Sequence, residues 1–264
     1  MIKSAEKVEN YIIQWLKDYL NNSGLNGFVV GVSGGIDSAL TSTLCAKTGN
    51  KVLCLEMPIY QESNQDNRAK NHINWLKKEF PSVSSYRLSL DNVFSSFLKS
   101  LPYTEKKDEQ LHSLANSRAR IRMTSLYYFA ALNKYLVAGT GNKVEDFGVG
   151  FYTKYGDGGV DLSPIADLNK TQVYALSKHL GINEEIQNAT PTDGLWGDDR
   201  TDEDQLGASY AEIEWAMDAH LNQSPKNHFS DREKIIYEIY NKLNKQNQHK
   251  MTPIPICQIP KEFI

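Results

Sequence analysis

The order of apolar and polar residues along the chain predicts strands and helices that alternate. Short apolar runs, typical of buried strands, lie at 28–30, 51–57, 85–90 and 135–138. Elsewhere apolar residues recur every three or four positions, which is typical of amphipathic helices. These helical segments are 4–21, 39–48, 65–80, 91–98, 114–133, 171–180, 210–221 and 231–243. The pattern predicts an α/β fold: a Rossmann-like, doubly wound, mostly parallel sheet with helices on both faces, in one domain over residues 1–264.

Residues that interrupt regular structure suggest several boundaries. The run from Asn21 to Gly24 ends the first helix, and Asp91 is placed to cap a short one. Residues 101–112 are polar and are expected to form a connection, whereas 188–205 are acidic and turn-rich, which indicates a mobile loop. The prolines of the tail are expected to exclude a helix from His249 onward.

The long segment 139–170 has little regular pattern and combines aromatic residues, glycines and charges. Long irregular segments inside compact domains are usually functional or disordered. This one follows an expected strand, and open α/β sheets bind ligands beyond the carboxyl ends of their strands. We therefore expect it to form part of a site. In the helix before it, the alternative without function for Arg118, Arg120 and Arg122 is a solvated face. However, Arg118 and Arg122 share one face, whereas Arg120 points elsewhere.

One stretch, FVVGVSGGIDS at 28–38, carries recognisable chemistry. An apolar strand runs into a Ser-Gly-Gly turn, and a helix follows. Such a turn directs several backbone N–H groups to one point, and the helix N-terminus adds partial positive charge, so the loop favours an anion. Ser33 and Ser38 can donate hydrogen bonds to phosphate oxygens. Asp37 would repel a phosphate unless a cation such as Mg²⁺ lies between them.

Two better-known phosphate motifs do not match this stretch. The GxxxxGK[ST] loop needs a lysine that is absent here, and the dinucleotide fingerprint GxGxxG fails because the glycines are Gly31, Gly34 and Gly35. The alternative without function is an ordinary Gly/Ser turn in an α/β domain. Ser-Gly-Gly-x-Asp-Ser directly after an apolar strand is too specific a pattern to favour that alternative.

Composition excludes several classes of protein. Hydrophobic content of 40% and charged content of 23% are those of a soluble globular chain, and the net charge of −3 argues against a protein that grips nucleic acid. The N-terminus is not a secretory signal, and no run approaches the roughly 18 apolar residues that span a bilayer, so no membrane partner is expected and the cytoplasm is the expected location. The cysteines form no CxxC pair, which indicates buried thiols in a reducing compartment, and the scattered histidines make zinc improbable.

Several blocks together resemble the NAD synthetases, within the wider group of ATP pyrophosphatases that share SGGxDS. Besides SGGIDS at 33–38, the blocks are GTGNKVE at 139–145, TKYGDGG at 153–159, LNK at 168–170, Pro191-Thr192 and His249-Lys250. SGGIDS alone indicates only the wider group, whose members also make GMP, asparagine, argininosuccinate and modified tRNA. TKYGDGG narrows the resemblance, which covers nearly the whole chain.

The resemblance implies a ligase that amidates deamido-NAD. ATP would activate the nicotinate carboxylate as an adenylate, pyrophosphate would leave, and attack by ammonia would give NAD and AMP. Asp37, Lys170 and Thr192 would be catalytic, with Lys170 on the phosphates. The positions that match ATP-binding residues of the family are Gly31, Val32, Ser33, Gly34, Gly35, Ile36, Asp37, Ser38, Thr140, Lys170 and Thr192.

The same resemblance assigns a second substrate site and a metal. The positions that match deamido-NAD contacts are Arg120, Lys154, Asp161, His249 and Lys250. Mg²⁺ is the implied cofactor, held by Asp37 and a second carboxylate. Counting forward from Thr140 selects Glu145 for that carboxylate, whereas counting back from Lys154 selects Asp146, because this chain has one extra residue between the two motifs. We favour Glu145, because the end of the strand fixes its position more directly.

The nitrogen source and the assembly also follow from the resemblance. Glutamine-dependent members carry a large nitrilase-like domain before the synthetase part, but SGGIDS begins here at residue 33, so we expect no glutaminase domain and free ammonia, or ammonia from a separate protein, as substrate. The family forms homodimers whose dinucleotide site spans the interface, and the aromatic-rich helices at 8–20 and 114–133 are consistent with that.

Two alternatives to this assignment remain. One is another SGGxDS enzyme, such as a tRNA-modifying one, which would usually bring a basic surface or a CxxC pair. The other is a nucleotide-binding module without chemistry, which would not need Asp37, Glu145, Lys170 and TKYGDGG together.

Overall fold

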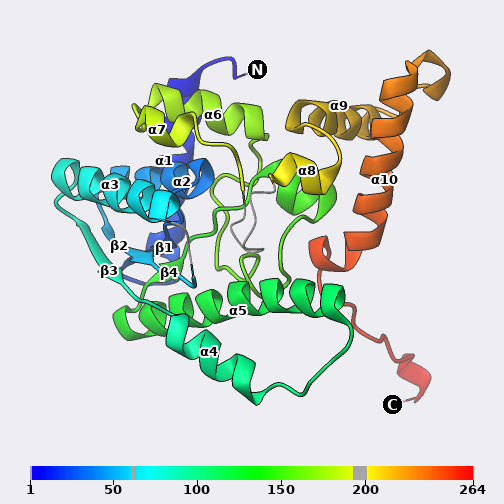
Figure 1. Cartoon of the computed structure of the whole chain (residues 1–264). Coiled ribbons are helices and arrows are strands. Elements are labelled where there is room, and N and C mark those ends of the chain that lie inside the picture. The colour runs from blue at the N-terminus through cyan, green and yellow to red at the C-terminus, as the bar shows by residue number, and fades with distance from the viewer. Residues whose placement is uncertain (1, 61–62, 193–200, 264) are drawn as a thin grey trace.

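The computed structural model of the protein describes residues 2–60, 63–192 and 201–263. Within this part of the chain four parallel strands form one sheet in the order β3-β2-β1-β4. The strands are β1 (Gly27–Gly31), β2 (Lys51–Glu56), β3 (Val83–Arg87) and β4 (Leu136–Val137). The chain adds β2 and β3 on one side of β1 and then returns to place β4 on the other side (Figure 1). The strand order therefore reverses between β1 and β4, which is where open α/β sheets bind ligands.

Helices cover both faces of the sheet (Figure 1). One face carries α1 (Ala5–Ser23), α2 (Ile36–Lys47), α3 (Ser63–Glu79), α6 (Lys170–His179) and α7 (Glu184–Gln187), and the other carries α4 (Asp91–Ser100) and α5 (Lys107–Asn133). Successive residues of a strand point to opposite faces. In β1, Phe28 and Val30 therefore belong to the core under α1, α2 and α6, whereas Val29 packs in a second core with Phe94 of α4 and Ala130 of α5.

A separate apolar cluster holds together a helical lobe beside the sheet. We use this name for the π-helix η1 (Lys143–Val149) together with α8 (Asp202–Leu206), α9 (Tyr210–Leu221) and α10 (Asp231–Met251). Two 3-10 turns, η2 (Lys226–His228) and η3 (Lys261–Phe263), complete the elements. The lobe packs against the sheet part through the contact of α9 with α6. A cavity lies where these two parts meet, lined by residues of both.

The predicted fold class is confirmed, and each segment predicted as a helix or a strand contains one. The prediction that Asp91 caps the short helix is wrong, because Leu90 is the N-cap of α4. The Asp91 carboxylate instead accepts hydrogen bonds from the backbone N–H of Tyr60 (2.7 Å) and from the Ser89 hydroxyl (2.9 Å).

Two helices extend beyond their predicted ends. Residues 107–112, expected to be a connection, form the first turns of α5, where Asp108 and Glu109 suit the positive end of the helix dipole. The helix α10 continues through His249 and Lys250, because the first proline of the tail comes only at position 253. The expectation of a non-helical tail is therefore wrong for His249 to Met251, and it is confirmed for residues 252–260, which contain the prolines.

Two segments expected to be irregular contain short helices. Residues 143–149 of the long irregular segment form η1, which begins at the Asn142 cap. Residues 202–206 of the acidic segment form α8, whose capping box joins Thr201 and Asp204. The rest of the loop predicted there, 193–200, lies outside the described residues. Cys45 and Cys54 are buried free thiols as expected, whereas Cys257 is exposed. In the described part of the chain no helix is both long and apolar enough to cross a membrane.

Candidate active site

A cavity of about 290 Å³ opens where β1 and β4 separate. These strands pair only through Phe28 with Leu136 and Val29 with Val137, and the chain then diverges on both sides. The loop after β1, the loop after β4 and the start of α6 all line the cavity. The strand-order reversal thus coincides with the loop that the sequence indicated as an anion site.

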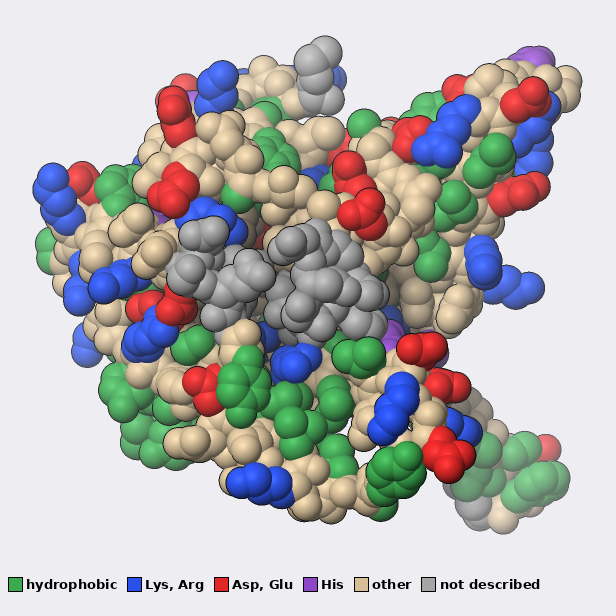
Figure 2. Space-filling view, in the orientation of Figure 1, with side chains coloured by type: hydrophobic (Ala, Val, Ile, Leu, Met, Phe, Trp, Pro, Cys, Tyr) green, Lys and Arg blue, Asp and Glu red, His purple; other side chains and the backbone are tan. Residues whose placement is uncertain are grey.

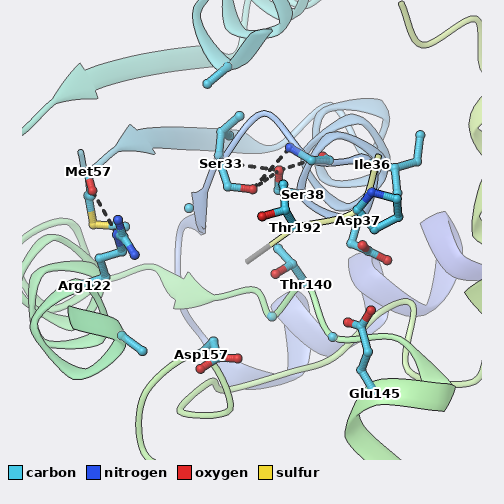
Figure 3. A pocket seen from close by; sticks show the side chains of 18 of the residues that line it. Ser33, Ile36, Asp37, Ser38, Met57, Arg122, Thr140, Glu145, Asp157 and Thr192 are labelled. Atoms are coloured by element: carbon cyan, nitrogen blue, oxygen red, sulfur yellow. Dashed lines mark hydrogen bonds between the residues drawn. The ribbon is translucent and has the colours of Figure 1, made fainter. Parts of the chain in front are cut away.

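The loop at 31–38 joins β1 to the N-terminus of α2, as its pattern predicted. Gly34 has φ +85°, a left-handed conformation that glycine adopts without strain. The Ser33 and Ser38 hydroxyls lie 3.2 Å apart, and Ser38 Oγ also donates to Gly35 O at 2.9 Å (Figure 3). All of the ATP-binding positions expected in this loop line the cavity except Gly34, whose carbonyl accepts from Arg68 Nε at 3.3 Å. The backbone of α2 supplies the positive end of a helix dipole to the same place.

Three charged side chains from three distant elements meet at the floor of the cavity. Lys170, the first residue of α6, is only 3% exposed. Its Nζ donates to Asp37 Oδ2 at 2.6 Å and to Glu145 Oε1 at 2.9 Å. Asp37 lies in the first turn of α2, and Glu145 lies in η1. We call these residues the Asp37–Lys170–Glu145 cluster; Figure 3 shows its two carboxylates directed toward each other.

Burial and the mutual attraction of these groups shift the pKa of all three. Burial alone would lower the pKa of the Lys170 ammonium, but the carboxylates of Asp37 and Glu145 raise it above its usual value. Burial raises the pKa of Asp37 against the opposing effect of Lys170. For Glu145 the Lys170 ammonium and the Tyr210 hydroxyl outweigh burial, so its pKa is lowered. One ammonium thus faces two carboxylates whose pKa values are shifted in opposite directions, that of Asp37 upward and that of Glu145 downward.

Asn142, which the sequence did not single out, bonds to the Asp37 carboxylate of the cluster. Its side chain is fully buried: Oδ1 accepts from the backbone N–H groups of Val144 and Glu145, both at 3.1 Å, and Nδ2 donates to Asp37 Oδ1 at 3.1 Å. The same residue therefore starts η1 and fixes Asp37. The available signal was an asparagine placed between a strand end and two acidic residues, as in other helix caps.

Asp146, the alternative second carboxylate, occupies a different place from Glu145. It lines the cavity, but its carboxylate lies against the Cα of Gly141, where a Cβ would be 2.0 Å from Asp146 Oδ2. Burial and the neighbouring carboxylates, Glu145 first among them, raise the pKa of Asp146 well above its usual value. Glu145, by contrast, shares a cation with Asp37. The position preferred from the sequence is therefore the one that faces Asp37.

The other expected ATP contacts also reach the cavity. Thr140 and Thr192 line it together with the loop, as Figure 3 shows. Arg118 and Arg122 differ from the expectation of a solvated face. The Arg118 guanidinium lies over the Phe94 ring at 4.7 Å, and Arg122 Nε donates to Met57 O at 2.9 Å on the cavity wall.

The expected deamido-NAD residues form a second group outside the lining of this cavity. Arg120 donates to Lys154 O through Nε and through a terminal nitrogen, at 3.3 and 3.2 Å, and Lys154 Nζ donates to His249 O. Lys250 Nζ is bonded to the carbonyls of residues 150 and 152, at 2.8 and 2.7 Å. Asp161 does not bond to these residues: its carboxylate accepts from the Tyr127 hydroxyl and the Val137 N–H. The structure thus brings Arg120, Lys154 and His249 into direct contact and leaves Asp161 apart.

The residues present fit a magnesium ion. The described residues contain no group of three or more Asp, Glu, His or Cys side chains arranged to hold a metal. Mg²⁺ does not need such a cage, since it usually binds through one or two carboxylates together with substrate phosphates and water. Asp37 and Glu145 supply two carboxylates that already share one cation position, beside a loop suited to phosphate. The position between them is taken by the Lys170 ammonium.

Comparison with known proteins identifies the family. The sequence model of the family described as NAD synthase matches residues 8–254. A curated NH(3)-dependent NAD(+) synthetase from Methanosarcina acetivorans is 36% identical over 264 aligned residues, which cover 96% of this chain and 98% of the relative.

Two solved structures extend the comparison. An NMN synthetase from Francisella tularensis has a TM-score of 0.82 and 30% identity, covering 98% of this chain and 100% of that one. An NH3-dependent NAD synthetase from Campylobacter jejuni, in complex with nitrate, has a TM-score of 0.77 and 28% identity, covering 97% of this chain and 100% of that one. The SGGIDS loop, the cluster beside it and these matches agree, and the chain belongs to the NAD synthase family.

Proposed function

We propose that this protein is an ammonia-dependent NAD synthetase, a ligase that forms a C–N bond. It activates the nicotinate carboxylate of deamido-NAD with ATP, releases pyrophosphate, and lets ammonia attack the adenylate to give NAD and AMP. The observation that carries the proposal is the Asp37–Lys170–Glu145 cluster beside a phosphate-binding loop at the strand-order reversal, in a chain of this family.

The chain's own residues account for the handling of ATP. The N–H groups at the start of α2 and the hydroxyls of Ser33 and Ser38 hold the pyrophosphate end of the nucleotide. The Lys170 ammonium offsets negative charge that develops on the departing pyrophosphate. Thr140 and Thr192, which line the same cavity, complete the nucleotide site. Asp37 and Glu145 would hold Mg²⁺, which neutralises phosphate charge when bound.

A separate set of side chains would bind deamido-NAD. Arg120, Lys154 and His249 form one polar group at the end of α10, with Lys250 beside it. Positive side chains at this place suit the diphosphate and carboxylate of the substrate. We assign Asp161 to the same substrate from the sequence resemblance, although its carboxylate here bonds to Tyr127 and Val137. No side chain needs to act as a covalent nucleophile, since substrate and ammonia supply the reacting atoms.

We further propose that the enzyme is a homodimer. On α1, Tyr11, Trp15 and Tyr19 are 74%, 37% and 40% exposed, and on α5 Tyr128 and Leu132 are 63% and 67% exposed. Such apolar faces are typical of interfaces. Tyr19 also donates to Asp161 O at 3.4 Å, so this surface adjoins an assigned substrate residue. Size-exclusion chromatography with light scattering tests this, and a monomer at micromolar concentration would contradict it.

We place the reaction in the cytoplasm, without nucleic acid or membrane as a partner. All three cysteines are free thiols, which suits a reducing compartment. Figure 2 shows basic and acidic side chains interspersed over this face of the molecule, without the single-sign stripe that tracks a phosphate backbone.

The reaction itself is tested with purified protein, ATP, Mg²⁺, ammonium and deamido-NAD, with products separated by chromatography. We expect NAD, AMP and pyrophosphate in equal amounts. ADP in place of AMP, or no NAD, would overturn the proposal. Glutamine should not replace ammonium, since the nitrogen source we propose is ammonia alone.

A second substrate deserves a parallel assay because of one observation. The similar structure from Francisella tularensis, at 30% identity, is that of an NMN synthetase. Nicotinate mononucleotide should therefore be offered in place of deamido-NAD. We expect a higher kcat/KM for deamido-NAD, and the reverse order would reassign the substrate while keeping the chemistry.

A further inference from the structure

The first two turns of α9 contact both sides of the active site. Tyr210 is the first residue of this helix and Glu214 lies one turn later, so their side chains share one face. Both are buried, at 5% and 9% exposure. Neither lies in a motif that the sequence resemblance used. The helix belongs to the helical lobe, whereas Asp37 and Lys170 belong to the sheet part.

Tyr210 touches two members of the cluster at once. Its hydroxyl lies 2.5 Å from Glu145 Oε1 and donates to it, and the same hydroxyl is 3.1 Å from Asp202 Oδ2. Its ring lies beneath the Lys170 ammonium, with Nζ 4.8 Å from the ring centroid. The negative face of the Tyr210 ring attracts the Lys170 ammonium, and the Tyr210 hydroxyl restrains the Glu145 carboxylate by a hydrogen bond. Tyr210 therefore fixes Glu145 and Lys170 relative to each other.

Glu214 fixes Lys170 through the backbone. Its Oε1 accepts from the Thr171 N–H at 2.9 Å, and its Oε2 accepts from the Thr171 hydroxyl at 2.7 Å. Thr171 is the second residue of α6, directly after Lys170. An anion at this helix terminus satisfies a free N–H group and complements the dipole. The helix that presents Lys170 is thus joined to the lobe that presents Glu145.

We propose that Tyr210 and Glu214 are positioning residues that align Lys170 with Glu145 for adenylation. The inference rests on the proposed function, because the alignment matters only if these two groups act on the same ATP and its metal. Residues that orient metal-ligating carboxylates typically contribute about 10–100-fold in metal affinity or activity. We expect the effect on the reaction to exceed the effect on folding, because both residues touch the cluster directly or through one neighbour.

The test of Tyr210 has a matched control in the same lobe. Tyr237 is also a buried tyrosine, but its hydroxyl faces His220 Nδ1 at 3.4 Å, away from the cluster. Tyr210→Phe should lower kcat about tenfold and leave the KM for deamido-NAD within about twofold. Tyr237→Phe should leave both constants unchanged, and the thermal midpoints of the two variants should be similar.

A second readout does not depend on turnover. Mn²⁺ binding in the presence of α,β-methylene ATP can be followed by electron paramagnetic resonance. Tyr210→Phe should weaken Mn²⁺ binding about tenfold, because the Glu145 carboxylate loses its restraint, and Tyr237→Phe should not. Equal Mn²⁺ affinity and equal kcat for Tyr210→Phe and Tyr237→Phe would overturn the role of Tyr210.

Glu214 is tested by loss and conservative rescue. Glu214→Ala removes both acceptors for Thr171 and should lower kcat about tenfold, whereas Glu214→Gln keeps one acceptor and should recover most of it. The active fraction of each variant is measured by the stoichiometry of α,β-methylene ATP binding, so that misfolded protein is not counted as slow enzyme. Full kcat in Glu214→Ala, or no recovery in Glu214→Gln at a full active fraction, would contradict the role of Glu214.

The failure of the positioning proposal can be told apart from the failure of the proposed function. If the native protein makes no NAD, the proposed function fails. If the native protein is active and the Tyr210 and Glu214 variants are as active as Tyr237→Phe, only the positioning proposal fails.

Discussion

Replacement of Lys170 by methionine removes the ammonium between two carboxylates. We expect Mg²⁺ to bind at the same place instead. The Lys170 ammonium is bonded to Asp37 at 2.6 Å and to Glu145 at 2.9 Å, and its side chain is only 4% exposed. The side chains of Asp37 and Glu145 are 17% and 16% exposed, so water screens their negative charges poorly. Methionine has a similar length without the charge. The variant therefore leaves two buried carboxylates facing each other without a cation between them.

The size of the effect follows from that loss. Removing one partner of a buried ion pair typically costs about 3–5 kcal/mol of folding free energy, because the remaining charge stays buried. In a protein of this size, 1 kcal/mol shifts the thermal midpoint by roughly 2–4 °C, so Lys170→Met should melt roughly 6–20 °C lower without a metal. Mg²⁺ can then bind between the carboxylates without displacing an ammonium. Ligand at about 100 times its dissociation constant returns roughly 2.7 kcal/mol.

The assay is a thermal melt with and without Mg²⁺, in the absence of ATP. We expect Mg²⁺ to raise the midpoint of Lys170→Met far more than that of the native protein, where the ammonium competes for the same oxygens. Lys170→Arg is the control, since it keeps a positive charge and should respond weakly. Isothermal titration should show the same order of Mg²⁺ affinity. An equal Mg²⁺ response in the native protein and Lys170→Met would refute the reasoning that metal and ammonium share one position.

Three further predictions concern single side chains. Asp37→Asn should abolish adenylation while the circular dichroism spectrum stays native; full activity would show that Asp37 holds no metal. Glu145→Gln should lose Mg²⁺-dependent activity and Asp146→Asn should keep most of it, because only Glu145 faces Asp37; the opposite result would transfer the metal role to Asp146. Burial lowers the pKa of His72 from 6.5 to about 4, so the unfolded chain binds a proton that the native protein does not, and stability should fall by about 3 kcal/mol as pH drops from 6.5 to 4. Denaturant unfolding of His72→Gln over the same pH range should show a smaller fall, and an unchanged slope would contradict the assignment.

The parts of this protein that the sequence predicted well depend on local signals. The apolar run at 28–30, the glycines after it and the polar start of α2 lie within a dozen residues, so strand, turn and helix could be placed together. The irregular segment 139–170 was recognised as site-forming, but η1 inside it has no periodicity of its own. Its start depends on Asn142, whose side chain also reaches Asp37, 105 residues away. Such a contact exists only after the sheet has formed.

Tyr210 illustrates what pattern reasoning could not supply. Along the chain it is only the first position of a segment predicted as an amphipathic helix. The contact that matters joins its hydroxyl to Glu145, 65 residues earlier, between two helices that only the folded helical lobe brings together. The sequence also could not decide between Glu145 and Asp146 as the second carboxylate. Because of one extra residue, counting forward from Thr140 selects Glu145 and counting back from Lys154 selects Asp146. The structure separates them by what each carboxylate faces: Asp37 and Lys170 in one case, and the backbone of Gly141 in the other.

The central claim, that the nicotinate carboxylate is activated by adenylation in this site, is tested most directly by oxygen isotope transfer. Deamido-NAD labelled with ¹⁸O in its carboxylate is turned over with ATP, Mg²⁺ and ammonium, and the nucleotide products are analysed by mass spectrometry. The account predicts that AMP gains one labelled oxygen, since the carboxylate oxygen stays on the α-phosphorus when ammonia displaces it, and that pyrophosphate gains none. Label in inorganic phosphate together with ADP, or unlabelled AMP, would contradict it.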